Sequence, residues 1–284
     1  MAPLGLGITF YKLSDHNTWQ FSPCQIRGLW TWLAAGRNIT ADTDSSGSSI
    51  DHDSEDAEMA DQDHINAWND MVNTVNAVQT THADKPEWDT ATADVGGMNM
   101  SDGARYMDLS ANIAINASQD FSIMMRAKVT DFGAVRGLLG HNSNNLLKVQ
   151  NAQSIRVIIG GSGTSTWTDS QELADDTYYI FTLTRADGAT GNLKMYVKAE
   201  GEDEIDWDSG ESHTDADAFT ISNLGAAGDD ANNFQGYIKD VLVYKDVALS
   251  AQEREQLYAY IFAQKSTGTD FMRGPDPGCP GSGR

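Results

Sequence analysis

Residues 233–250 read NFQGYIKDVLVYKDVALS, and this stretch decides the fold class. After its glycine, Val241 and Val243 alternate with other residues, which is the pattern of a β-strand. Asp246 marks a turn, and Leu249-Ser250 leads out of it. The stretch therefore predicts a long strand that is followed directly by the start of a helix.

The helix itself is also specified by the sequence. Ser250-Ala251-Gln252-Glu253 is a capping box, in which the first and last side chains bond each other's backbone N–H groups. Leu257, Tyr260 and Ile261 then repeat at helical spacing. We expect one short amphipathic helix that closes one edge of a β-sandwich.

Upstream of this stretch, short β-like runs alternate with turn signals at the spacing of a sandwich. Ala186-Asp187-Gly188 and Thr190-Gly191-Asn192 lie between two such runs and predict a hairpin with a glycine-bearing loop. The clearest runs are Tyr106–Leu109, Phe121–Val129, Leu146–Val149, Ile155–Ile159, Tyr178–Leu183, Leu193–Val197, Phe219–Ile221 and Tyr237–Tyr244.

The length of 284 residues suits one large domain with tails. We divide the chain into an N-terminal docking arm (1–25), a β-sandwich (26–265) and a C-terminal tail rich in Gly and Pro (266–284). Within the sandwich, residues from about 38 to 63 are expected to form an acidic insertion.

Charge restricts the class of partner. The formal net charge is −22, and residues 38–84 contain eleven acidic side chains and no Lys or Arg. A protein that neutralises phosphates needs a basic face, so we expect no nucleic-acid partner. The sequence contains no glycine-rich phosphate-binding loop, so we expect no nucleotide cofactor. It also contains no apolar run long enough to span a membrane. The acidity fits a salty, marine medium.

Three blocks of the sequence resemble the laminin G-like, concanavalin A-like lectin/glucanase domain found in bacteriophage virion structural proteins. The first is Ser22–Ala35, continued by Ile65–Asp70 and Val78–Trp88, and the second is Arg105–Leu109 with Gln119–Ile123. The third is Tyr178–Arg185 with Gly191–Lys198, followed by the closing stretch quoted first. The resemblance implies an all-β fold: a two-sheet antiparallel jelly-roll sandwich with one C-terminal helix and extended tails. This fold hosts many functions, so it specifies the architecture better than the activity.

One segment stays undecided between helix and strand. Ile65, Trp68, Val72 and Val75 are spaced as on one face of a helix. The family pattern instead places a strand at residues 65–68.

The resemblance implies a bacteriophage virion structural protein, a surface decoration or accessory protein of the capsid or tail. The alternative is a carbohydrate-binding tail or fibre component that contacts host surface glycans. A glycoside hydrolase is the third hypothesis, and we expect no enzyme activity. The implied partners are other virion proteins, and we expect a homo-oligomer on the virion surface.

The N-terminal arm resembles segments that phage virion proteins carry ahead of such a domain. It has no basic region or cleavage site of a signal peptide, which fits release of particles by host lysis. Its aromatic residues have too few partners to be buried within the arm, so we expect them to dock onto neighbouring virion subunits. These residues are Phe10, Tyr11, Trp19 and Phe21.

The acidic insertion contains a partial match to a calcium loop, with alternating oxygen ligands, a glycine for the turn and an acid at the twelfth position. The closing residue is the shorter Asp, and no flanking helices are indicated. A calcium site and a solvated loop without a metal both remain open. The candidate ligands are Asp42, Asp44, Ser46 and Asp53.

Glu204-Ile205-Asp206-Trp207-Asp208 is similar to the Glu-x-Asp-x-Glu strand of concanavalin-type glucanases. Alternation along a strand would place its three carboxylates on one side. Its last residue is Asp where that pattern has Glu, and the family pattern places a loop here. We therefore assign no catalytic residue.

Three aromatic residues, Trp167, Trp207 and Tyr178, are candidates for a sugar-stacking platform, although tryptophans in a sandwich are more often core or contact residues. The histidines show no paired spacing, and we interpret each as an ordinary surface or turn residue. Cys24 and Cys279 lie in the two tails, and we expect two unpaired thiols; the alternative is a disulfide that ties the two ends together.

Overall fold

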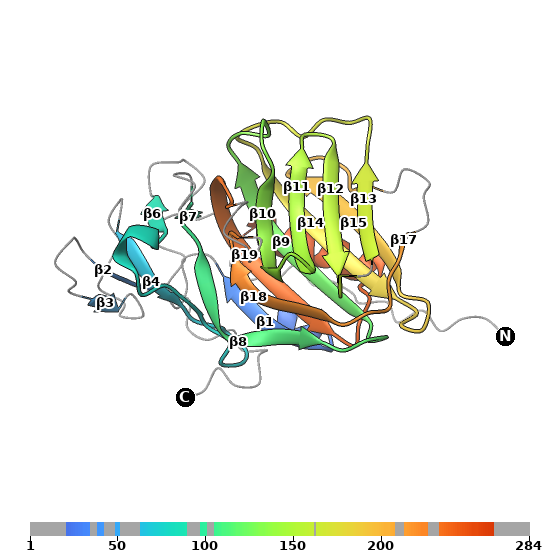
Figure 1. Ribbon diagram of the computed structural model, residues 1–284, viewed down its shortest axis with the longest axis horizontal. Helices are drawn as coiled ribbons and strands as arrows, with labels where there is room; N and C mark the ends of the chain where they lie inside the picture. Colours follow the sequence, from blue (N-terminus) through green and yellow to red (C-terminus); the bar gives the residue numbers. More distant parts are fainter. Residues whose placement is uncertain are drawn as a thin grey trace, which may run out of the picture.

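The structure is a computed structural model that describes residues 21–34, 39–42, 49–51, 63–89, 97–100, 105–161, 163–207, 213–226 and 233–263. These residues form two packed layers of antiparallel strands and one α-helix (Figure 1). The predicted antiparallel β-sandwich with a C-terminal helix is therefore confirmed.

The first layer contains the strand that the opening stretch predicts, and that strand pairs on both sides. In spatial order the layer consists of β1 (Leu29–Ala34), β19 (Gly236–Lys245), β9 (Phe121–Val129), β14 (Tyr178–Ala186) and β15 (Asn192–Ala199), with the short strands β16 (Ile205–Asp206) and β17 (His213–Thr214) beyond β15.

The second layer is longer and ends in a small extension. In spatial order it consists of β13 (Gly163–Thr168), β12 (Ser154–Ile159), β11 (Asn145–Asn151), β10 (Arg136–Asn142), β18 (Phe219–Leu224), β8 (Met107–Ile115), β5 (Ala77–Val78), β4 (His64–Trp68), β2 (Ile39–Asp42) and β3 (Ser49–Asp51). β6 (Glu87–Asp89) and β7 (Gly97–Asn99) connect β4 to β19 and so join the two layers. Two 3₁₀ turns cover Pro23–Gln25 and His82–Asp84.

The main core lies between the layers and follows from alternation along the strands. On β12, Ile155, Val157 and Ile159 are buried, and on β19 Val241 and Val243 are buried in the same cluster. Successive side chains of a strand point to opposite faces, so the intervening residues point away from this core. Each layer therefore also has an outer face.

The helix α1 (Ala251–Ala263) covers the outer face of the first layer. It starts at the predicted capping box: the Glu253 N–H donates to Ser250 Oγ (3.3 Å), and the Ser250 N–H donates to Glu253 Oε2 (2.8 Å). Its buried side chains share a second core with outward-pointing residues of β1, β9, β14 and β19, namely Trp32, Met124, Ile180 and Leu242. The expectation that the helix closes an edge is wrong, because these large apolar side chains sit in the middle of the layer and need a cover.

Seven of the eight predicted runs lie within strands, and the eighth, Tyr106–Leu109, begins one residue before β8. The predicted hairpin joins β14 to β15 with Ala186 opposite Asn192. Residues 65–68 form β4, as the family pattern placed them, so the helical alternative is wrong. The sequence did not indicate β10, whose Gly137 and Gly140 weaken its strand pattern.

Two further expectations meet the structure here. Cys24 is disulfide-bonded, so the expectation of an unpaired thiol at this position is wrong; Cys279 lies outside the described residues. Among the described residues, no helix has both the length and the apolar character needed to cross a membrane.

Candidate functional site

The outer face of the second layer, called the open face below, lies on the side of the sandwich away from α1. It is formed by the outward-pointing residues of β8, β18, β10, β11, β12 and β13, and Figure 1 shows β10–β13 side by side in front of the first layer. On β12 the residues of this face are Ser154, Arg156 and Ile158, which alternate with the core residues.

One row of paired residues crosses the open face from β8 to β13. Its ends are polar, and its middle contains a glycine, which leaves the backbone of β10 accessible to neighbouring side chains. In spatial order the row is Asp108, Asn223, Gly140, Leu146, Ile158 and Thr164.

The strand register is irregular at one end of this row. It shifts between Ile221 and Asn223 on β18 and between Gly140 and Asn142 on β10. The residues at these shifts are Ser222 and His141. β-Bulges reorient side chains and are over-represented next to active sites. The irregularities therefore mark this part of the open face as a candidate site.

Four polar side chains form a continuous chain of hydrogen bonds at the bulges. Asn223 Nδ2 donates to Asp108 Oδ1 (2.5 Å), and Ser222 Oγ donates to Asn223 Oδ1 (2.5 Å). The chain ends at His141, whose Nδ1 lies 2.9 Å from Ser222 Oγ. We call Asp108, His141, Ser222 and Asn223 the bulge cluster.

The chemistry of these groups determines the direction of every hydrogen bond in the bulge cluster. A carboxylate only accepts, so the amide of Asn223 must turn its nitrogen to Asp108 and its oxygen to Ser222. Ser222 donates its one hydroxyl hydrogen to that oxygen, so the hydrogen bond to His141 must be donated by His141 Nδ1. In the neutral ring Nε2 is then an acceptor, which can receive a hydroxyl hydrogen from a ligand.

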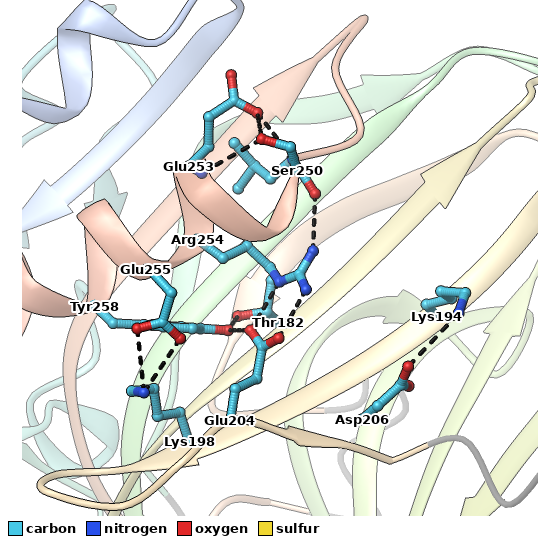
Figure 2. Close-up of polar contacts among 11 residues, drawn as sticks. Thr182, Lys194, Lys198, Glu204, Asp206, Ser250, Glu253, Arg254, Glu255 and Tyr258 are labelled. Atoms are coloured by element: carbon cyan, nitrogen blue, oxygen red, sulfur yellow. Dashed lines mark hydrogen bonds and ion pairs between the residues drawn. The ribbon is translucent and has the colours of Figure 1, made fainter. Parts of the chain in front are cut away.

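Glu204, the first carboxylate of the glucanase-like pattern, lies under α1 and is held there. Arg254 donates to it through Nε (2.8 Å) and Nη2 (2.7 Å), and the Tyr258 hydroxyl donates to Glu204 Oε2 (2.6 Å). Figure 2 shows this group, in which Tyr258 also meets the Thr182 hydroxyl at 3.1 Å. The interaction links α1 to the strands of the first layer.

Electrostatics agree with a fixed ion pair at Glu204. Burial raises the pKa of the Glu204 carboxyl, but the hydrogen bonds from Arg254 and Tyr258 outweigh burial and bring the pKa below its ordinary value. Burial, followed by the bond to Glu204, raises the pKa of Tyr258 strongly. A glycosidase general acid needs a raised pKa. Asp206 lies 3.6 Å from Lys194 (Figure 2), and Asp208 is outside the described residues.

The predicted sugar-stacking platform is wrong. The indoles of Trp167 and Trp207 are fully buried in the main core and offer no ring face to a ligand. Tyr178 is half-buried, and the Lys239 Nζ lies 4.1 Å from the centre of its ring. Burial of large aromatic area in the core stabilises the sandwich and therefore competes with display on the surface.

Trp30 on β1 is the single large hydrophobic side chain exposed among the described residues, at 41%. One face of its ring is occupied by Lys245, whose Nζ lies 3.9 Å from the ring centre. Trp30 belongs to the opposite layer from the bulge cluster and is a separate surface feature.

Of the four predicted calcium ligands, one lies among the described residues. The backbone of Asp42 ends β2 and pairs with Ser49 of β3, so this segment is a β-hairpin. Asp44, Ser46 and Asp53 lie outside the described residues. The described residues contain no group of three His, Cys, Asp or Glu side chains suited to a metal ion. Calcium binding stays a prediction.

Two histidines form a pair that their sequence spacing did not predict. The rings of His64 and His82 lie 4.2 Å apart, and His64 Nε2 lies 4.0 Å from Glu87 Oε1. Burial lowers the pKa of His64, and His82 lowers it further. His82 is exposed and begins a 3₁₀ turn, which agrees with its interpretation as a surface or turn residue, whereas His64 is half-buried on β4.

One of the four docking residues has a different role from the predicted one. The ring of Phe21 packs edge-on against Tyr260 of α1, with 6.1 Å between ring centres. Nearby, the Tyr244 hydroxyl donates to the Pro23 carbonyl (3.3 Å). Phe21 is thus committed to the second core. Phe10, Tyr11 and Trp19 lie outside the described residues.

Sequence reasoning missed the bulge cluster, since register shifts leave no simple pattern in a sequence. His141 and Ser222 are 81 positions apart, and Asp108 and Asn223 are 115 apart. One signal was accessible: four strands of the open face, β10 to β13, come from residues 132–168, which contain no Asp or Glu.

Residues 101–253, more than half of the chain, match the family described as the concanavalin A-like lectin/glucanases superfamily. The chain belongs to this superfamily. The match begins just before β8 and ends in α1, so it includes the whole open face and the first layer except β1, but not the extension formed by β2 to β5. The predicted resemblance to the concanavalin A-like lectin/glucanase domain is confirmed.

Solved structures are similar in fold only. Domain 4 of the arabinanase AbnA from Geobacillus stearothermophilus, in complex with arabinotriose, is 13% identical, with a TM-score of 0.46 and coverage of 80% of this chain and 97% of that one. Trypanosoma rangeli sialidase is 14% identical, with a TM-score of 0.42 and coverage of 86% and 34%. This chain thus spans about a third of the sialidase. A search of curated proteins found no match.

Proposed function

We propose that this protein is a carbohydrate-binding domain whose ligand lies on the open face. The observation that carries the proposal is the bulge cluster, a directed hydrogen-bond chain that links β8, β18 and β10 on that face. Membership of a lectin-containing superfamily supports the same function. The outer face of the first layer is occupied by α1 and its apolar contacts.

The chemistry of the bulge cluster suits sugar hydroxyls, each of which both donates and accepts hydrogen bonds. Asp108 contributes carboxylate oxygens from an exposed position, and His141 contributes Nε2 from a half-buried position. Ser222 and Asn223 hold these two groups from between them. A preorganised network loses little freedom when a ligand binds, which favours affinity.

Calorimetric titration with a panel of oligosaccharides tests the proposal. Asn223→Ala removes the central amide, and we expect about tenfold weaker binding for a lost hydrogen-bonded group. Asn192→Ala, an exposed change on β15, is the matched control and should leave affinity unchanged. Loss of binding on Trp30→Ala with no effect of Asn223→Ala would move the site to β1 and contradict the assignment.

The proposal treats the domain as a binding module without hydrolytic activity. Its support is the engagement of Glu204 by Arg254 and Tyr258, which leaves this carboxylate paired. A reducing-sugar assay on the saccharides that bind should detect no new reducing ends. Release that disappears in Glu204→Gln would overturn this part of the proposal.

We further propose that the domain serves on the surface of a bacteriophage particle, with residues 1–20 as the docking arm to capsid or tail subunits. The support is the resemblance of the N-terminal segment to phage virion arms. Deletion of residues 1–20 keeps Phe21, which the domain needs for its contact with Tyr260. The deleted protein should fold and bind saccharide but fail to enter particles. Normal incorporation would refute the docking role.

A further inference from the structure

We infer that the ligand of the open face is an acidic saccharide, one that carries carboxylate or sulfate groups. This inference rests on the proposed function and specifies its ligand class. Its first support is a gap in the distribution of acidic residues. The chain has 41 Asp and Glu residues, yet the 37 residues from Phe132 to Thr168 contain none. These residues contain all of β10, β11, β12 and β13.

Two cations occupy neighbouring positions on this part of the open face. Lys148 of β11 and Arg156 of β12 are directly opposite each other in the strand register. Both alternate with core residues, so both point outward. Like charges that are directly opposite destabilise a pair of strands. An anionic group between two cations is attracted by both.

Arg156 has no carboxylate partner among the described residues. It makes a long hydrogen bond from Nη2 to Thr164 Oγ1 (3.5 Å). Its Nε is buried and has no hydrogen-bond partner among the described residues. A guanidinium presents its N–H groups as a planar fork, which suits a bidentate ligand such as a carboxylate or sulfate.

Three other arginines of the protein are paired with carboxylates. Arg254 meets Glu204, Arg105 meets Glu87, and Arg136 at the start of β10 meets Asp131. With a net charge of −22, the protein supplies a carboxylate to these guanidinium groups. Arg156 differs from these three guanidinium groups, because it has no carboxylate partner among the described residues.

Position connects Arg156 to the bulge cluster. Thr164, which Arg156 contacts, belongs to the same row as Gly140 and Asn223. Strands are about 4.8 Å apart, so β12 and β10 are separated by about 10 Å across the sheet. A short oligosaccharide bound along the row can place an acidic group on Arg156 and its hydroxyl groups on His141.

The test uses tetragalacturonate and its methyl ester, which differ in charge and share one sugar backbone. We expect tetragalacturonate to bind wild-type protein at least about tenfold more tightly than the ester, as for charge-assisted hydrogen bonds. Arg156→Gln should abolish this preference, and Lys148→Gln should reduce it. Lys194→Gln, the same charge change on β15, is the control and should preserve it.

Further arms separate the sources of charge. Dextran sulfate and uncharged dextran are compared next. Binding of dextran sulfate that is weakened by Arg156→Gln, together with no binding of dextran, supports a shared anion site. Polyglutamate that competes equally well would overturn the inference, since it has no sugar. Thermal unfolding of each variant checks folding, and Arg156→Gln should leave Tm unchanged or higher.

The outcomes distinguish the two proposals. Equal binding of the acid and its ester, weakened by Asn223→Ala, would refute the acidic ligand and keep the carbohydrate-binding site. An absence of binding for every saccharide, charged or neutral, would refute both.

Discussion

The two outer faces of the sandwich follow the same alternation along their strands, but one is apolar and covered by α1 and the other carries polar side chains. Outward-pointing residues of the first layer, such as Trp32, Met124 and Leu242, are large, apolar and buried under α1. Those of the second layer include Lys148, Arg156 and Thr164, which are polar. A strand pattern specifies that two faces exist, and the character of the outward residues decides which one can meet a ligand.

The covered face owes part of its cohesion to a polar group. Arg254 donates to Glu204 and also, through Nη1, to the Leu249 carbonyl (3.0 Å), while its guanidinium lies 3.6 Å from the ring centre of Tyr196. On the open face, the polar groups of the bulge cluster join strands that are already paired. We therefore expect mutations under α1 to affect stability and mutations on the open face to affect binding.

The largest effect is expected for Arg254→Ala, which leaves Glu204 half-buried without its cation. Removal of one partner from a buried ion pair costs about 3–5 kcal/mol of unfolding free energy. Urea unfolding measures the change. The double variant Arg254→Ala, Glu204→Gln should recover part of the loss, because the uncompensated charge is gone. A loss below about 1 kcal/mol in the single variant would show that the pair does not hold α1.

A pH dependence sharpens the same contrast. The pKa of Glu204 is lower in the folded protein than its ordinary value of 4.5, so the folded state favours the charged form. Its contribution to stability is complete above about pH 4.5 and is lost as pH falls through the folded pKa. We expect the stability difference between wild type and Glu204→Gln to shrink in this acidic range. A difference that stays constant with pH would contradict the ion pair.

A smaller effect is expected at the start of α1. Ser250→Ala removes the side-chain oxygen that accepts from the Glu253 N–H, and loss of such a cap costs about 1 kcal/mol. Urea unfolding should show this decrease. Ser250→Asp retains an acceptor and should restore most of it, whereas an unchanged stability in Ser250→Ala would mean that packing alone positions the helix.

The smallest effect on stability is expected on the open face. Thr166 of β13 lies opposite Arg156 and is half-buried. Thr166→Ala should alter unfolding free energy by no more than about 0.5 kcal/mol, as for surface changes away from special features. Thermal unfolding checks this value. A loss comparable to that of Ser250→Ala would show that the open face is a packed surface rather than a binding surface.

Much of the fold followed from local sequence. The run around Val241 and Val243 specified β19, because alternation of apolar residues is a local property. Ser250 and Glu253 specified the start of α1 for the same reason. β10 escaped notice because its glycines hide the alternation, although its place between β11 and β18 puts it at the centre of the open face.

The candidate site could not be predicted in the same way. Trp167 and Trp207 suggested a sugar platform, but the packing of the two layers buries both. Glu204 suggested catalysis, but the position of α1 pairs it with Arg254. His141 had no neighbour in sequence to suggest a role, and two register shifts bring it to Ser222.

The sequence by itself determined the class of fold, the strand and helix that end the domain, and the unequal spread of charge, since periodicity, capping and composition are local quantities. Only the tertiary structure decided which face of the sandwich α1 covers, which aromatic side chains are buried, which acidic side chains are paired, and which polar residues lie together on the open face. The physical reason is that burial and hydrogen bonding in a sandwich depend on pairings between strands that are far apart in the chain.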